Sequence, residues 1–266
     1  MAKDRRPSAR LSLKSGGVFP LLFTCLFGDP ATGFAKDISQ ADLITIGNSA
    51  LRFSKADDSS HSFDDTAALG RTFRLTIPFK RNEIPSMPDR NEGWTYDSDS
   101  QQLTLTVVGH GWMTTHRPDP SLHLSFSVLE GFEISNVIAH RGRRREQNAF
   151  GAQVDVNYGD MTSVGVAAIT PDTIAKSVKF DRDWNAIVSI ISIGPDDARK
   201  KMAHAIVVVE GSIAPLENGH AILCDNDGTA ATFDSPTTVS ERFCVFNAVV
   251  TRVKIESDGE VLAEWK

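Results

Sequence analysis

Apolar and polar residues alternate along most of the chain beyond residue 70, which is the pattern of strands with one buried face. In 73–79 every second residue is apolar, and 103–107 and 122–128 repeat the pattern. Further runs rich in strand-forming residues are 150–158, 161–169, 186–193, 205–213 and 242–255. Because the period is two rather than 3.6, these segments predict a sheet protein.

Short turn sequences separate some of these runs and indicate antiparallel hairpins. They are 97–100, 159–160 and 258–259, and the last of them is an Asp-Gly pair, which is typical of two-residue hairpin turns. A two-residue loop at 258–259 places Arg252 opposite Trp265, where a cation–π contact is expected.

One short helix is predicted at 194–202, where a proline and two carboxylates open the segment and basic residues close it. The segment 36–69 fits a helix and a strand equally well, and we expect it to be poorly ordered or partly helical. The predicted fold class is mostly β, with one or more antiparallel sheets, sandwich- or barrel-like, and one or two short helices. We expect residues 70–266 to form a single antiparallel β domain.

Residues 1–35 have the three parts of a secretory signal peptide. Basic residues precede the apolar run 17–27, and 33–35 is a small-x-small cleavage sequence. The alternative is a first helix buried in the domain, which Pro20 disfavours. The apolar run is shorter than the roughly 20 residues that cross a bilayer. We therefore expect no transmembrane segment, a mature chain that begins at Lys36, and a periplasmic or secreted protein.

The cysteines agree with export. Cys25 lies in the predicted signal, and Cys224 and Cys244 remain as an even pair in a chain expected to meet an oxidising compartment. We predict one disulfide, which closes a loop of about 21 residues and contributes about 3 kcal/mol. The alternative is a zinc site, but only His220 lies near the pair in sequence.

Composition excludes several classes of protein. Hydrophobic residues make up 41% of the chain and charged residues 23%, which is typical of a globular rather than a disordered protein. Removing residues 1–35 takes five basic side chains from 28 and two acidic ones from 34, so the net charge becomes −9. A negative protein disfavours nucleic acid, and we expect no nucleic-acid partner.

Short motifs of the common enzyme classes are absent from the sequence. There is no Gly-x-Ser-x-Gly, phosphate-binding loop, Gly-x-Gly-x-x-Gly or His-Glu-x-x-His. We therefore expect no cofactor. Whether the protein is an enzyme stays open, because a triad assembled from distant residues leaves no local motif.

His110 and His123 flank a segment predicted to be a loop, 111–120, and His116 lies within it. A hairpin across it would bring His110 and His123 to one end of a hydroxyl-lined face, where they are candidates for metal binding or acid–base catalysis. The alternative is an ordinary solvent-facing side of a sheet. Trp112 is a candidate ligand contact or a cover on the core.

Residues 225–228, Asp-Asn-Asp-Gly, resemble part of a calcium loop. With Gly228 at the sixth position, Asp225, Asp227 and Asp234 occupy liganding positions, but Leu223 stands at the first and cannot ligate. The alternative is a turn inside the disulfide loop.

Residues 141–145 contain four arginines, and we expect them in a loop. Arg143, Arg144 and Arg145 are candidates to bind an anionic component of the cell envelope. The alternative is a solvated loop without a partner.

These observations predict an exported, soluble β-domain protein with a binding or structural role in the envelope. The alternative is a periplasmic hydrolase with its site around His110 and His123. An enzyme should show imidazoles that converge with a carboxylate in a pocket.

Overall fold

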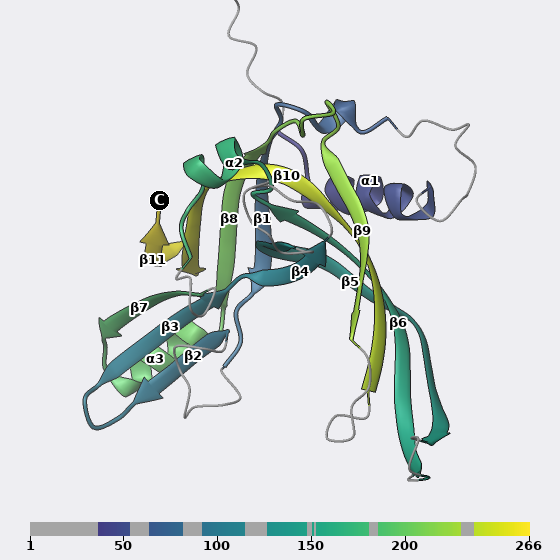
Figure 1. Cartoon of the computed structure of the whole chain (residues 1–266). Coiled ribbons are helices and arrows are strands. Elements are labelled where there is room, and N and C mark those ends of the chain that lie inside the picture. Colours follow the sequence, from purple (N-terminus) through teal and green to yellow (C-terminus); the bar gives the residue numbers. More distant parts are fainter. Residues whose placement is uncertain are drawn as a thin grey trace, which may run out of the picture. The chain divides into compact units, whose positions relative to one another are not determined.

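The alternating segments of the chain form two β-sheets (Figure 1). The computed structural model describes residues 37–53, 64–81, 92–114, 127–147, 151, 153–180, 186–229 and 237–266. The strands in these ranges are β1 (Thr72–Pro78), β2 (Gly93–Asp97), β3 (Gln102–Val108), β4 (His110–Thr114), β5 (Ser127–Gln147), β6 (Gln153–Ala167), β7 (Ala186–Ser192), β8 (Ala205–Ile213), β9 (Ile222–Thr229), β10 (Thr237–Ser257) and β11 (Glu260–Trp265). The prediction of a mostly β fold is confirmed.

The larger sheet has the strand order β1-β8-β10-β6-β5-β4, and β9 and β11 also pair with β10. The smaller sheet consists of β2, β3 and β7. Most neighbours are antiparallel, but β6 and β10 are parallel, which makes the larger sheet mixed. Its path ends at β1 and β4, so the described strands form an open sheet rather than a closed barrel.

Strand β10 connects the two halves of the larger sheet. Its first half, up to Asn247, pairs with β6 and β9, whereas its second half, from Ala248, pairs with β8 and β11. Strands that are far apart in sequence therefore become neighbours in the sheet because each of them pairs with β10.

The predicted hairpin turns have different outcomes. The turns after Asp97 and Ser257 are confirmed, and Asp258 and Gly259 both have the positive φ of a two-residue hairpin turn. The turn at 159–160 is wrong, because β6 runs unbroken through it and pairs with β5 on one side and β10 on the other.

The predicted register of the last hairpin is wrong by one position. Trp265 lies opposite Val253 because a bulge follows Ile255. Arg252 instead pairs with Glu210 and Glu264.

The helices are α1 (Gln40–Phe53), α2 (Pro171–Lys176) and α3 (Pro195–Met202). Helix α3 confirms the one predicted. Helix α1 occupies the first part of the undecided segment 36–69, and residues 54–63 of that segment lie outside the described residues. The buried side of α1 includes Leu43, Gly47 and Leu51, which are spaced by four residues. Gly47 lies so close to β6 that a Cβ there would be 2.4 Å from Val164.

Two apolar clusters lie on opposite faces of the larger sheet. The larger cluster joins α1 to residues of both sheets, among them Phe73, Leu105 and Val164. The smaller cluster includes Trp112, Leu129, Ala167, Ile169, Leu216, Phe243 and Val245. Val164 and Phe243 illustrate the alternation, because neighbouring positions of β6 and β10 contribute to opposite faces.

Cys224 and Cys244 are directly opposite each other in β9 and β10 and form the predicted disulfide, which is confirmed. The predicted signal peptide lies outside the described residues. Among the helices that are described, none has both the length and the apolar character needed to cross a membrane.

Candidate metal centre

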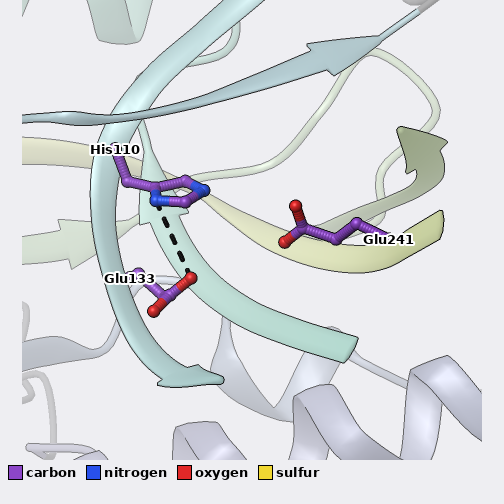
Figure 2. Close-up of side chains that lie close together, drawn as sticks. All are labelled: His110, Glu133 and Glu241. Atoms are coloured by element: carbon purple, nitrogen blue, oxygen red, sulfur yellow. Dashed lines mark ion pairs between the residues drawn. The ribbon is translucent and has the colours of Figure 1, made fainter. Parts of the chain in front are cut away.

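Three ligand-type side chains from three strands converge on one face of the larger sheet (Figure 2). They are His110 at the start of β4, Glu133 in β5 and Glu241 in β10. One nitrogen or oxygen atom of each lies within 4.8 Å of the other two. The Nδ1 atom of His110 lies 3.7 Å from Oε2 of Glu133.

Strand register explains why these side chains meet. His110 lies opposite Gly131, and Glu133, two residues further along β5, therefore points to the same face. Glu133 lies opposite Gly165 of β6, and β10 is the next strand across the sheet. At Gly165 the absence of a side chain makes room for the Trp112 ring, which lies over this position on the same face.

A chain of hydrogen bonds holds Glu241 in place. Its Oε1 atom accepts a hydrogen bond from the Ser163 hydroxyl, and Ser163 Oγ accepts one from the Trp112 indole at 3.0 Å. The rings of Trp112 and His110 are 4.4 Å apart between centroids. Trp112 therefore touches one ligand directly and the other through Ser163.

The electrostatic environment of the cluster disfavours two ionised carboxylates. Burial raises the pKa of Glu133, and the charge of Glu241 raises it further, while His110 and a hydrogen bond from Asn136 oppose the change. Among the described residues, the one basic side chain within ion-pair distance of Glu133 is His110, and no ion pair joins a basic side chain to Glu241. The cluster is therefore deficient in positive charge.

A cavity of about 360 Å³ adjoins the cluster and is partly lined by His110 and Glu133. Ile77, Val108 and Phe132 supply apolar walls, and Glu92 adds a third carboxylate. Desolvation, and then the charge of Glu133, raise the pKa of Glu92.

One imidazole nitrogen and two carboxylate oxygens form a ligand set that suits Zn²⁺, Mn²⁺ or Fe²⁺. Three protein ligands leave further coordination positions for water or for a small molecule. A cation here would also neutralise the repulsion between Glu133 and Glu241.

The structure places the histidine candidates unequally. His110 belongs to the cluster, whereas His116 and His123 lie outside the described residues, so the predicted pairing of His110 with His123 stays a prediction. Trp112 was expected in a loop, but it is buried in β4, because pairing with β5 extends that strand to Thr114. A direct ligand contact by Trp112 also remains a prediction.

The arginines at 141–145 lie in β5, not in a loop, because the β5–β6 pairing continues as far as Gln147. Their side chains are well exposed, and three of them pair with nearby carboxylates. These pairs are Arg143–Asp155 at 2.9 Å, Arg144–Glu146 at 2.6 Å and Arg145–Asp155 at 3.2 Å. Their predicted anionic partner is not tested by these contacts.

The residues 225–228 lie in strand β9, so the expected turn is wrong. Asp225 accepts a hydrogen bond from Thr114 of β4 at 2.7 Å. The side chain of Asp227 and the whole of Asp234 lie outside the described residues, and the calcium interpretation stays a prediction.

Glu133, Glu241 and Ser163 were not predicted from the sequence. Alternation predicts which face of a strand each residue occupies, but it does not say which strands are neighbours. The parallel pairing of β6 with β10 places Glu241 at the site, and no local sequence pattern predicts this pairing.

Comparison with known protein families, with curated proteins and with solved structures finds no match to this chain.

Proposed function

We propose that the protein is an exported β-domain protein that binds a divalent metal ion through His110, Glu133 and Glu241. The observation that carries this proposal is the convergence of three ligand atoms within 4.8 Å, from strands distant in sequence. Two carboxylates placed together in partly buried surroundings repel each other unless a cation or a proton lies between them. A bound ion would supply the missing positive charge.

Export is supported by two independent features. The Cys224–Cys244 disulfide is typical of proteins that fold in an oxidising compartment. The first 35 residues have the basic, apolar and small-x-small order of a signal peptide. A periplasmic or secreted metal-binding protein combines both features with the cluster.

A metal-dependent hydrolase is the second candidate function. The specific observation in its favour is the cavity of about 360 Å³ beside the cluster, which His110 and Glu133 help to line. A metal ion with three protein ligands and an adjoining cavity can activate a bound water molecule. Ion-dependent turnover of an ester or a phosphoester would favour this candidate over a binding role.

Metal titration tests the proposal. The mature protein, stripped with a chelator, should bind about one Zn²⁺ or Mn²⁺ ion per chain in isothermal titration calorimetry. His110→Ala and Glu133→Gln each remove a metal ligand. Each should therefore weaken metal affinity by more than the roughly 10- to 100-fold that is typical for losing a residue that only hydrogen-bonds to a ligand.

Two matched variants serve as controls. His204→Ala removes an exposed histidine beyond α3, and Glu130→Gln removes an exposed carboxylate from the opposite face of β5. Both should bind the ion as the wild type does. Absence of binding in the wild type, or equal losses in the control variants, would contradict the proposal.

A further inference from the structure

The Glu241 carboxylate has one oxygen already engaged. Ser163 donates a hydrogen bond to Oε1, and both residues are buried, with exposed fractions of 1% for Ser163 and 9% for Glu241. The Trp112 indole N–H can only donate, and it donates to Ser163 Oγ. The hydroxyl proton of Ser163 is therefore free to point at Glu241.

The residues behind this hydrogen bond are fixed by packing. Trp112 is fully buried, and its ring lies 6.2 Å from that of Phe243 between centroids. The ring also covers Gly165, where a Cβ would lie 2.3 Å from it. Ser163 therefore receives its hydrogen bond from a side chain that has little space for another rotamer.

The second carboxylate is restricted in a similar way. Oε2 of Glu133 accepts a hydrogen bond from Asn136 at 3.1 Å. This oxygen is also the one that lies 3.7 Å from Nδ1 of His110. In each glutamate one carboxylate oxygen therefore already accepts a protein hydrogen bond, which competes with bidentate binding of an ion. The cluster thus favours an ion held by one imidazole nitrogen and one oxygen from each carboxylate.

This donor set discriminates between classes of metal ion. Ca²⁺ takes six to eight oxygen ligands and commonly uses a bidentate carboxylate, and Mg²⁺ requires octahedral oxygen ligands. Zn²⁺ binds imidazole nitrogen and monodentate carboxylate oxygen in a four-coordinate site. We infer that Ser163, held by Trp112, is a positioning residue that makes the His110–Glu133–Glu241 cluster selective for a transition-metal ion such as Zn²⁺ over Ca²⁺ and Mg²⁺. This inference rests on the proposed metal-binding function.

Calorimetric titration of the mature protein with Zn²⁺, Ca²⁺ and Mg²⁺ tests the inference. The wild type should bind Zn²⁺ at least about 100-fold more tightly than Ca²⁺. Ser163→Ala should weaken Zn²⁺ binding by about 10- to 100-fold and reduce the ratio of Zn²⁺ to Ca²⁺ affinity, because Glu241 regains its second oxygen. Ser163→Thr keeps the hydroxyl and should recover most of the Zn²⁺ affinity.

Ser257→Ala is the matched control. Ser257 is also a buried serine, it lies on β10 itself, and its hydroxyl donates to the backbone oxygen of Lys201, away from the cluster. This variant should have the wild-type affinities for all three ions. An equal loss of Zn²⁺ binding in Ser257→Ala would overturn the inference, since it would show a general effect of a lost buried hydroxyl.

The outcomes separate the inference from the proposed function. Wild-type binding of Zn²⁺ with an unchanged affinity ratio in Ser163→Ala overturns the inference and leaves the metal site intact. A wild type that binds none of the ions overturns both. If Ser163→Ala does not fold, Trp112→Phe removes the indole donor but keeps an aromatic ring, and an unchanged ion preference in that variant also overturns the inference.

Discussion

Two groups of carboxylates lie along β10 and differ in what surrounds them. In the second half of the strand, Glu256 and the neighbouring Glu210 of β8 face three basic side chains. The shortest ion pairs there are Arg74–Glu210 at 2.6 Å, Arg74–Glu256 at 2.8 Å and Lys254–Glu210 at 3.0 Å. In the first half, Glu241 faces Glu133 and a single histidine.

The pKa of Glu210 in the first group and the pKa of Glu133 in the second are shifted in opposite directions. Burial raises the pKa of Glu210, but hydrogen bonds and charges from Lys254 and Arg74 outweigh it, and the net pKa is lowered. Burial and Glu241 raise the pKa of Glu133. The first group is neutralised by the chain itself and stabilises the sheet, whereas the second needs a cation or a proton from outside. This difference separates a structural ion-pair network from a candidate binding site.

Removing the charge of Lys254, which lies between Glu210 and Glu256, should have the largest effect on stability. The Lys254 side chain is 11% exposed and lies within 3.5 Å of Glu210 and Glu256. Lys254→Met keeps the apolar stem but leaves the carboxylates without this partner, and it should lower the free energy of unfolding by about 3 kcal/mol. Urea unfolding measures this loss. Lys266→Met, which removes an exposed ion pair with Glu264, should cost less than about 1 kcal/mol.

Removing a charge from the group formed by Glu133 and Glu241 should have the opposite effect on the free energy of unfolding when no metal is bound. Glu241→Gln keeps an acceptor for Ser163 but removes a buried negative charge, so in chelator the variant should be as stable as the wild type or more stable by about 1 kcal/mol. Zn²⁺ at about 100 times its Kd should stabilise the wild type by about 2.7 kcal/mol and the variant far less. Destabilisation in chelator comparable to that of Lys254→Met would mean that the two groups do not differ.

The pKa shifts of Glu133 and Glu210 should change the free energy of unfolding in opposite directions as pH falls. The raised pKa of Glu133 means that the folded state takes up this proton first, so its contribution to the free energy of unfolding rises as pH falls towards the ordinary glutamate pKa. The lowered pKa of Glu210 means that the unfolded state takes up the proton first, so its contribution is lost as pH falls below that ordinary value.

Urea unfolding of metal-free protein over a series of acidic pH values measures both slopes. Glu133→Gln should remove the rise, and Glu210→Gln should remove the loss. Identical pH profiles for the two variants would contradict the assignment of opposite shifts.

The exposed arginines of β5 should give the smallest effect on stability. Their side chains are about two-thirds exposed, so water and salt weaken their ion pairs. Replacing Arg143, Arg144 and Arg145 by Gln should change the free energy of unfolding by less than about 1 kcal/mol. If these residues bind an anionic envelope component, retention on anionic lipid vesicles at low salt should fall, and unchanged retention would contradict that role.

Local pattern was sufficient for part of this protein. Period-2 alternation identified most strands, the Asp258–Gly259 pair identified a hairpin, and the charge order of 194–202 identified α3. The disulfide followed from an even number of cysteines left after the predicted signal. The strands, the hairpin turn and the helix depend on local backbone geometry and on residues close together in the chain, so local sequence patterns predict them.

Pairing between distant strands decided the rest. The Gly159–Asp160 pair has the composition of a turn, yet it lies in a continuous strand because β5 and β10 supply partners on both sides. The sequence by itself identified His110 as a candidate ligand, but the segment before it, β3, belongs to the smaller sheet, so the predicted continuous hydroxyl-lined face is not formed. Only the tertiary structure decided that Glu133 and Glu241 share a face with His110, since alternation determines where a side chain points and long-range packing determines which strands become neighbours.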